Sequence, residues 1–261
     1  MSDDDLIREQ RDDILVLRLN RPDSRNSLTR AMIDDIGQAI IDAENDPGIG
    51  AVVLTGTGDK AFCAGMDLRS FASGGIAPTE DEQKYMGTFG KFMSRGECGV
   101  PVIGAAQATA LAGGFELLMA CDLIVANEDA KFGLPEVKRG LFAAGGGMFL
   151  SRRIPLAKAL ELTLTGDPIS AAEAASLGLV NKVVPAASVL DAAIELAERV
   201  AANGPLGVQA TKELVRMAAF APADDVWKVH AERQASVFAS DDAKEGATAF
   251  VEKRAPVWHG R

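Results

Sequence analysis

Residues 101–126 read P-V-I-G-A-A-Q-A-T-A-L-A-G-G-F-E-L-L-M-A-C-D-L-I-V-A. Within this stretch Val102–Ala106 and Leu123–Ala126 are short apolar runs, which are typical of buried strands. The glycine pair Gly113-Gly114 lies between them and marks the expected start of a helix that joins the two strands. Strands that alternate with helices in this way predict a layered α/β domain with a parallel sheet.

The same alternation continues on the N-terminal side of this stretch. Ile14–Asn20 and Ala51–Thr55 are apolar runs that predict two more strands. The second run is continuously apolar, which predicts a strand covered on both faces. Between them, apolar residues at helical spacing predict a helix over Thr29–Ala43.

From Leu156 onward the pattern becomes mostly helical. Proline and glycine separate the predicted helices, which are Leu156–Leu164, Ala171–Leu177, Ala186–Ala202, Leu206–Phe220, Ala223–Ala239 and Asp242–Lys253. We therefore divide the chain into an α/β core with the active site, residues 1–198, and a helical region, residues 199–261. The last helices are expected to pack on another subunit rather than on the core.

Composition and charge limit the classes of protein to which the chain can belong. It has 261 residues, of which 48% are hydrophobic and 25% charged, as in ordinary globular proteins. The net charge of −10 argues against nonspecific nucleic-acid binding. We also expect no membrane span and no signal peptide. Three cysteines without metal-type spacing favour free thiols in the cytoplasm.

Glu116 stands in an unusually apolar setting for a carboxylate. Between Val100 and Ala126 the only charged residues are Glu116 and Asp122. Such a carboxyl is hard to ionise unless polar groups solvate it. Free backbone N–H groups at the helix start near Gly113 would supply a donor for a developing oxyanion. The alternative is close helix–sheet packing at the glycines, with Glu116 bonded to the backbone.

Glu136 is a second candidate, in the segment G-L-P-E-V-K-R-G. Pro135 stiffens the turn before it, although a Pro-Glu pair is also typical of a helix start. Glu116 and Glu136 are separated by one crossover of the chain, which can return both carboxyls to one side of a sheet. The run Gly145-Gly146-Gly147 just beyond is expected either to open another helix there or to form a flexible turn.

The segment K-A-F-C-A-G-M-D-L, Lys60–Leu68, follows a predicted strand. Small residues at its centre let a ligand approach the backbone, where the next N–H belongs to Met66. A plain turn between strand and helix is the alternative interpretation. Ser70–Glu82 is expected to be a mobile loop over the site near Asp67.

Several segments in one consistent order resemble the crotonase family, and within it the enoyl-CoA hydratases. They are N-R-P-D-S-R-N-S-L, A-V-V-L-T-G, A-F-C-A-G-M-D-L, P-V-I-G-A-A-Q, L-A-G-G-F-E-L-L-M-A-C-D, F-G-L-P-E-V-K-R-G-L, L-T-G-D-P-I-S-A-A-E-A, G-L-V-N-K-V-V-P and E-G-A-T-A-F-V-E-K-R. The resemblance covers nearly the whole chain. It implies a spiral of ββα units with a helical C-terminal region that forms homotrimers, often paired into hexamers.

The resemblance also implies a lyase of fatty-acid β-oxidation with defined site residues. The oxyanion hole consists of the N–H groups of Met66 and Gly113, and the acid–base pair is Glu116 and Glu136. The substrate- or CoA-binding positions are Ser24, Arg25, Ala64, Asp67, Leu68, Gly114, Phe250 and Lys253. The last two match positions that reach a CoA bound to a neighbouring subunit. No metal or redox cofactor is required, since coenzyme A is part of the substrate.

More than one function on the same scaffold remains open at this point. Leu134 replaces a glutamine that is usual in well-studied hydratases, Asp23 replaces a basic residue, and residues 143–148 depart from the usual glycine-rich run. The L-P-E-x-K-x-G form is similar to carnitinyl-CoA dehydratases, so the acyl group is open. An enoyl-CoA Δ3,Δ2-isomerase, a thioester hydrolase or decarboxylase, and a non-catalytic acyl-CoA-binding protein are further possibilities. RNA binding fits the acidic charge poorly.

Overall fold

A six-stranded sheet forms the centre of the molecule. The computed structural model describes residues 5–67, 89–90, 92–93 and 97–261. The strand order is β1-β2-β3-β4-β6-β9. The bounds are β1 Leu6–Arg11, β2 Ile14–Leu19, β3 Ala51–Gly56, β4 Val102–Ala106, β6 Leu123–Asn127 and β9 Lys182–Val184. All neighbours pair in parallel except β1 and β2, which form an antiparallel hairpin.

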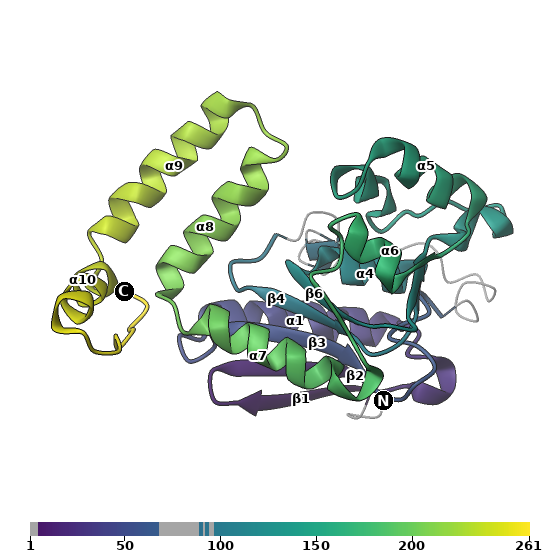
Figure 1. Cartoon of the computed structure of the whole chain (residues 1–261), viewed down its shortest axis with the longest axis horizontal. Coiled ribbons are helices and arrows are strands. Elements are labelled where there is room, and N and C mark those ends of the chain that lie inside the picture. The colour runs from purple at the N-terminus through teal and green to yellow at the C-terminus, as the bar shows by residue number, and fades with distance from the viewer. Residues whose placement is uncertain (1–4, 68–88, 91, 94–96) are drawn as a thin grey trace.

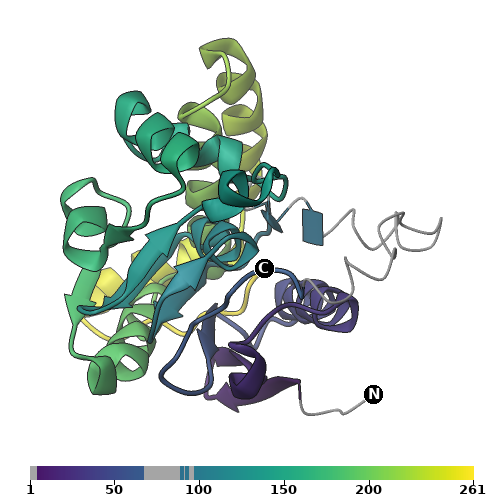
Figure 2. The same ribbon diagram turned by 90° about the vertical axis from the view of Figure 1, so that its right-hand side faces the viewer.

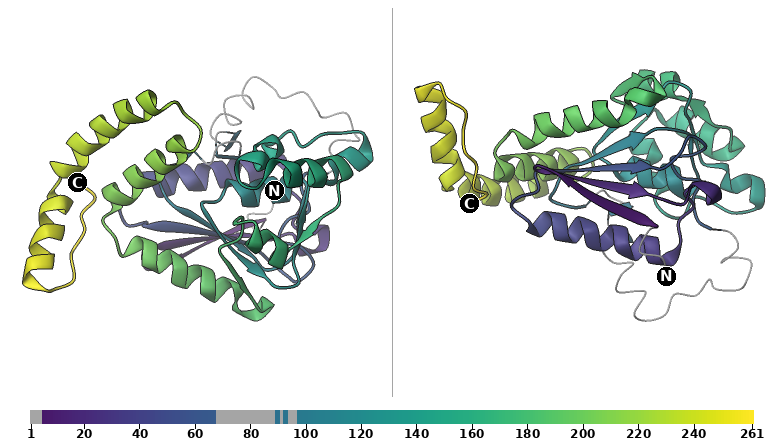
Figure 3. Two further views of the ribbon diagram at one scale, coloured as in Figure 1. Left: turned by 45° about the horizontal axis from the view of Figure 1, so that its top comes forward. Right: turned by 90° about the horizontal axis from the view of Figure 1, so that it is seen from below.

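Both faces of this sheet are covered, as the continuously apolar strand predicted. In β3, Val52 and Leu54 belong to one hydrophobic cluster, whereas Ala51 and Val53 belong to another on the opposite face. Helices α1 (Arg30–Asn45) and α7 (Val189–Ala201) supply the covering side chains of these two clusters. Figure 3 shows the sheet between these two helices.

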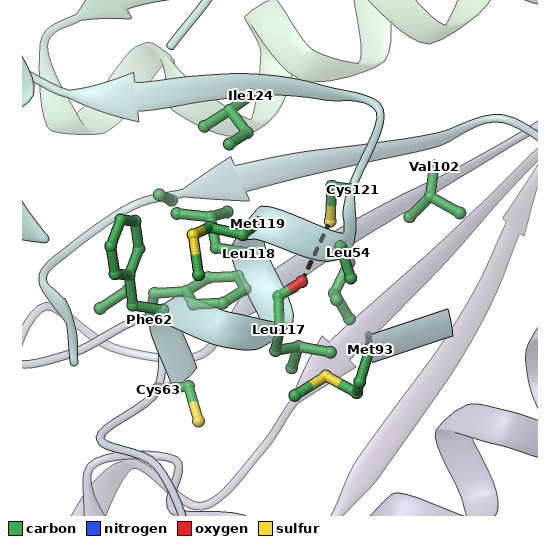
Figure 4. Close-up of a cluster of buried hydrophobic side chains, with 14 of the residues drawn as sticks. Leu54, Phe62, Cys63, Met93, Val102, Leu117, Leu118, Met119, Cys121 and Ile124 are labelled. Atoms are coloured by element: carbon green, nitrogen blue, oxygen red, sulfur yellow. Dashed lines mark hydrogen bonds between the residues drawn. The ribbon is translucent and has the colours of Figure 1, made fainter. Parts of the chain in front are cut away.

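Helix α4 (Gly113–Ala120) lies within the core and connects β4 to β6. All eight of its residues are buried. Its side chains pack among Leu54, Val102 and Ile124, one from each of β3, β4 and β6 (Figure 4). Because a helix surrounded by protein excludes water, any charged group on it depends on protein partners for its solvation.

A second, smaller sheet lies beside the first and has the order β5-β7-β8. The strands are β5 Ala110–Leu111, β7 Lys131–Gly133 and β8 Ile169–Ser170. Strands β4 and β6 of the large sheet are thus each followed by a short strand of the small sheet, β5 or β7, and then by helical structure. The remaining helical segments of the core are η1 Pro22–Ser24, η2 Pro135–Arg139, η3 Gly147–Arg152, α5 Leu156–Thr165, α6 Ala171–Ser176 and η4 Ala186–Ser188.

Three C-terminal helices, α8 (Pro205–Ala218), α9 (Ala223–Phe238) and α10 (Asp241–Glu252), form what we call the helical arm. Figure 1 shows the arm projecting to one side of the sheet, with α8 and α9 side by side. Ion pairs from α8 attach it to the core: Lys212 Nζ lies 2.8 Å and Arg216 Nη2 2.7 Å from the Asp122 carboxylate.

The sequence missed some short or polar elements. Strand β1 was not predicted because its pattern L-I-R-E-Q-R is largely polar, as suits the exposed edge of a sheet. Figure 2 shows the purple β1–β2 hairpin at the edge of the molecule remote from α5. The predicted helix Ala186–Ala202 is divided into η4 and α7. The expected mobile loop over Ser70–Glu82 lies outside the described residues.

Two simpler expectations concern cysteines and membranes. Cys63, Cys98 and Cys121 are all free, as the sequence predicted. Among the helices that the structure describes, none combines the length and the apolar character needed to cross a bilayer.

Candidate active site

Met66 lies in a short extended segment that pairs with Leu28 through an isolated parallel bridge, and this pairing sets the direction of the Met66 amide. Residues on either side of it bond to Leu28: the Leu28 N–H donates to the Gly65 carbonyl (2.8 Å) and the Asp67 N–H donates to the Leu28 carbonyl (3.0 Å). Since successive amides of an extended chain point to opposite sides, the Met66 N–H is directed away from Leu28. Gly65, with φ +93°, makes the turn that this requires.

The amide of Gly113 lies next to that of Met66. A Cβ placed on Gly65 would lie 3.0 Å from the Gly113 nitrogen, and one placed on Gly113 would lie 3.7 Å from the Met66 nitrogen. As the first residue of α4, Gly113 has an N–H without an acceptor inside the helix. Ala112 before it has φ 53° and ψ −135°, which an alanine rarely adopts. This strained residue directs the Gly113 N–H.

Glu116 lies one turn further along α4 and is only 4% exposed. Its Oε1 accepts a hydrogen bond of 2.8 Å from the Gly147 N–H at the start of η3. Burial raises the pKa of Glu116, the bonds from Gly147 and Gly145 oppose that shift, and the charge of Glu136 adds to it. Burial therefore favours the neutral form of this carboxyl, and two backbone donors partly offset that preference.

Glu136 lies on η2, which begins with Pro135. The interpretation of the Pro-Glu pair as a helix start is confirmed, because Glu136 occupies the first turn of this short helix. Its Oε2 is buried and has no hydrogen-bond partner among the described residues. Burial raises the pKa of Glu136, opposed by its own backbone N–H and by Arg139. A buried carboxyl oxygen without a partner is costly, so it indicates a place for a substrate atom or a water molecule.

These groups form one chemical arrangement. Two neighbouring amide donors are suited to a developing oxyanion, and two carboxyls with raised pKa are suited to moving a proton beside it. Within the described ranges, no group of three or more His, Cys, Asp or Glu side chains is placed to hold a metal ion.

Some of the expected CoA-binding residues lie beside the two amides. The Ala64 N–H donates to the Arg25 carbonyl (3.1 Å), which places the loop of Ser24 and Arg25 next to the Met66 segment. Asp67 forms a 3.3 Å ion pair with Arg21. Ser24 is half-buried and Arg25 is exposed with a left-handed backbone.

Other expected residues lie elsewhere. Phe250, 85% exposed, lies in the last turn of α10, and Lys253 is its C-cap residue. Figure 1 shows α10 in the outer part of the arm, away from α4. Gly114 is packed against the backbone of Cys63, so the packing alternative describes this glycine. Leu68 lies outside the described residues.

Sequence reasoning missed several contributions to the site. The expected helix start at the glycine run is confirmed by η3, which begins at Gly147, but the bonds from the Gly145 and Gly147 N–H groups to Glu116 were not predicted. The strain at Ala112 leaves no signal in composition. Asn26 is fully buried, accepts from the Arg21 N–H (2.9 Å) and donates to the Ala61 carbonyl (2.9 Å). Its position within the N-R-P-D-S-R-N-S-L segment was the available clue.

Comparisons with known proteins place this geometry in context. The family model for enoyl-CoA hydratase/isomerase matches residues 9–261. Enoyl-CoA hydratase EchA19 of Mycobacterium tuberculosis is 40% identical over 267 residues, which cover 98% of this chain and 97% of that protein. Carnitinyl-CoA dehydratase of Salmonella typhi is 37% identical over 253 residues, which cover 95% of each protein.

Solved structures agree with these matches. The crystal structure of enoyl-CoA hydratase EchA1 from Mycobacterium marinum superimposes with a TM-score of 0.90 at 44% identity, covering 99% of this chain and 100% of that one. The enoyl-CoA hydratase from Bacillus anthracis gives a TM-score of 0.89 at 33% identity and covers 98% and 100%. The mixed α/β fold predicted from the sequence is thereby confirmed as that of these hydratases.

Proposed function

The chain belongs to the enoyl-CoA hydratase/isomerase family, and from that premise we propose that it is an enoyl-CoA hydratase of fatty-acid metabolism. Such an enzyme, a hydro-lyase, adds water reversibly across the 2,3 double bond of a 2-enoyl-CoA thioester. The observation that supports this most directly is the pair of buried carboxyls, Glu116 and Glu136, of which one has an oxygen without a partner among the described residues.

In the proposed mechanism the thioester carbonyl accepts hydrogen bonds from the Met66 and Gly113 N–H groups. As water adds at C3, negative charge moves through the conjugated system onto this oxygen. Preorganised amide donors stabilise such a charge by about 3 kcal/mol each, because they need no reorganisation during the reaction. The proximity of the two nitrogens supports this role.

Glu116 and Glu136 divide the two protons of the reaction. Glu116 as carboxylate removes a proton from the water whose oxygen bonds to C3, and Glu136 as carboxylic acid delivers a proton to C2. In the reverse direction the roles exchange. The bond from Gly147 supports the charged form of Glu116, whereas the absence of a donor to Oε2 of Glu136 within the described structure supports its neutral form.

The proposal extends to the surroundings of the site. Ser24, Arg25, Ala64 and Asp67 are expected to contact the CoA moiety, and no cofactor is needed. Phe250 and Lys253 are expected to reach the CoA of a neighbouring subunit in a homotrimer or hexamer, which their exposure on the outer helix supports. Three free thiols support a cytoplasmic location.

The test of this function is the absorbance of the conjugated enoyl thioester during incubation with crotonyl-CoA. A hydratase removes this absorbance and forms 3-hydroxybutyryl-CoA, which chromatography identifies. If neither crotonyl-CoA nor a panel of longer and branched 2-enoyl thioesters is hydrated, the proposal is wrong. Conversion of a Δ3-enoyl thioester to its Δ2 isomer without hydration would instead identify an isomerase.

A carnitinyl-CoA dehydratase-like activity is the second candidate. Two observations favour it: carnitinyl-CoA dehydratases are among the relatives at 35–37% identity, and Leu134 is apolar and 1% exposed directly beside Pro135 and Glu136. An apolar side chain at this position changes the surroundings of the acid. Dehydration of carnitinyl-CoA faster than hydration of crotonyl-CoA would decide for this candidate.

The pH dependence of hydration follows from the two raised pKa values. Hydration requires Glu116 to be ionised and Glu136 to be protonated. The carboxyl pair is therefore active when it holds one proton in total, and it titrates in two steps. As pH falls, Glu116 is protonated at a pH above the 4.5 of an ordinary glutamate. We therefore expect a bell-shaped plot of kcat/KM, measured with crotonyl-CoA, whose acid limb lies above 4.5. A kcat/KM that stays at its full value down to pH 4.5 would contradict this expectation.

A further inference from the structure

The C-terminal end of α4, the helix that carries Glu116, is bound by an arginine from the segment that follows the glycine run. Arg153 Nη1 donates to the Met119 carbonyl at 2.8 Å and to the Cys121 carbonyl at 3.4 Å. The Met119 carbonyl belongs to the last turn of α4 and the Cys121 carbonyl to its C-cap. Carbonyls at this end of a helix lack N–H donors inside the helix and favour a cation. Arg153 thus caps this helix from another part of the chain.

The segment 147–153 is therefore tied to α4 at two points. At one end the Gly147 N–H bonds to the Glu116 carboxylate, and at the other end Arg153 bonds to the Met119 carbonyl. Between these points η3 is continuous, and the Arg153 N–H itself donates to the Leu150 carbonyl (2.9 Å). Two attachments fix this short segment in place. Loss of the bond from Arg153 to Met119 would therefore allow the Gly147 end to move relative to Glu116.

We propose that Arg153 is a positioning residue, whose guanidinium holds η3 against α4 so that the Gly147 N–H stays on the Glu116 carboxylate. The inference rests on the proposed function, since it concerns the base of that reaction. Arg153 neither touches the site nor bears on the charge of Glu116 directly: the charged group acting on Glu116 is Glu136 of η2. The charged or titratable groups around Arg153 are Cys121, Asp122 and Arg216.

The adjacent arginine offers a matched control. Arg152 belongs to the same segment but is exposed and stacks on Phe149 and Phe220, with its guanidinium carbon 4.4 Å and 4.6 Å from the ring centroids. Arg153→Met and Arg152→Met therefore make the same chemical change one residue apart, and only the first removes the bond to α4. Arg153→Lys keeps the charge and places all its N–H donors on a single nitrogen.

The experiment measures the titration of Glu116 by NMR of ¹³C-carboxyl-labelled glutamate in the full chain, with the signal assigned through Glu116→Gln. In Arg153→Met we expect the midpoint to rise by about one pH unit, because a hydrogen bond that favours the carboxylate is weakened. We also expect kcat to fall about 10- to 100-fold with KM little changed, since misplacement affects the reaction more than binding. Arg152→Met should match the wild type in both measurements, and Arg153→Lys should be intermediate.

An unchanged Glu116 midpoint in folded Arg153→Met would overturn the inference, even if activity fell, because it would show a structural role alone. If Arg153→Met does not fold, an unchanged midpoint in Arg153→Lys has the same meaning. The titration needs no turnover. A wild-type protein that hydrates no enoyl thioester would therefore refute the proposed function and still leave the effect of Arg153 on Glu116 measurable.

Discussion

Replacement of Glu116 by glutamine is expected to lower kcat for hydration of crotonyl-CoA by about 10²- to 10⁴-fold, the usual contribution of a general base. Glutamine keeps the size of the side chain and an oxygen that can accept the Gly147 N–H, but it cannot take a proton from water. Because the Met66 and Gly113 amides are unchanged, binding of the thioester should persist, and calorimetry with a saturated acyl-CoA measures it.

Two further variants complete this experiment. Glu136→Gln should lose activity by a similar factor, since the proton at C2 would have no donor, and the double variant should lose little more if the two carboxyls act as a unit. Glu128→Gln, on the exposed turn after β6, makes the same chemical change on the surface and should be fully active. Wild-type turnover in both site variants would refute the assigned roles.

The second large effect is expected from Gly114→Ala. A Cβ on Gly114 would lie 2.1 Å from the carbonyl oxygen of Cys63 and 2.6 Å from its carbonyl carbon, so the backbone of α4 or of the Cys63 segment must shift. Overpacking of this kind costs about 3 kcal/mol. A shift of α4 would displace Gly113, and a shift of the Cys63 segment would displace Met66. Since an error of about 1 Å in a catalytic group can cost 10²-fold, kcat should fall by about that factor.

Thermal unfolding and steady-state kinetics measure these two consequences. The melting temperature should fall by about 6–12 °C, from the expected loss of stability and the size of the chain. Gly207→Ala is the control, because a Cβ at this position in α8 would meet no atom of the described residues within 4 Å beyond its own helix backbone and chain neighbours. That variant should be as active as the wild type and at least as stable, since alanine favours a helix more than glycine does. A fully stable and active Gly114→Ala would contradict the close contact.

Local sequence patterns were sufficient for most of the regular structure. The strands β3, β4 and β6 are nearly continuous apolar runs, and such runs are typical of strands in a sheet that is covered on both faces. Helix α1 could be predicted because its buried residues recur at helical spacing behind a Thr29 cap. The small sheet could not, since strands of two or three residues carry no periodicity and form only when distant segments pair.

The sequence alone determined the class of the fold and the family resemblance, and it singled out Glu116 and Glu136 as candidate acid–base residues. Apolar runs and motifs in a fixed order are visible without coordinates, and so is Glu116 as a single glutamate in an apolar segment. Only the tertiary structure decided how the site is assembled. It placed the Met66 amide beside that of Gly113, turned Gly147 onto Glu116 across 31 positions of the chain, and left Phe250 on the outer arm. Such contacts join residues far apart in the chain, so they depend on how the crossovers pack and leave no trace in local spacing.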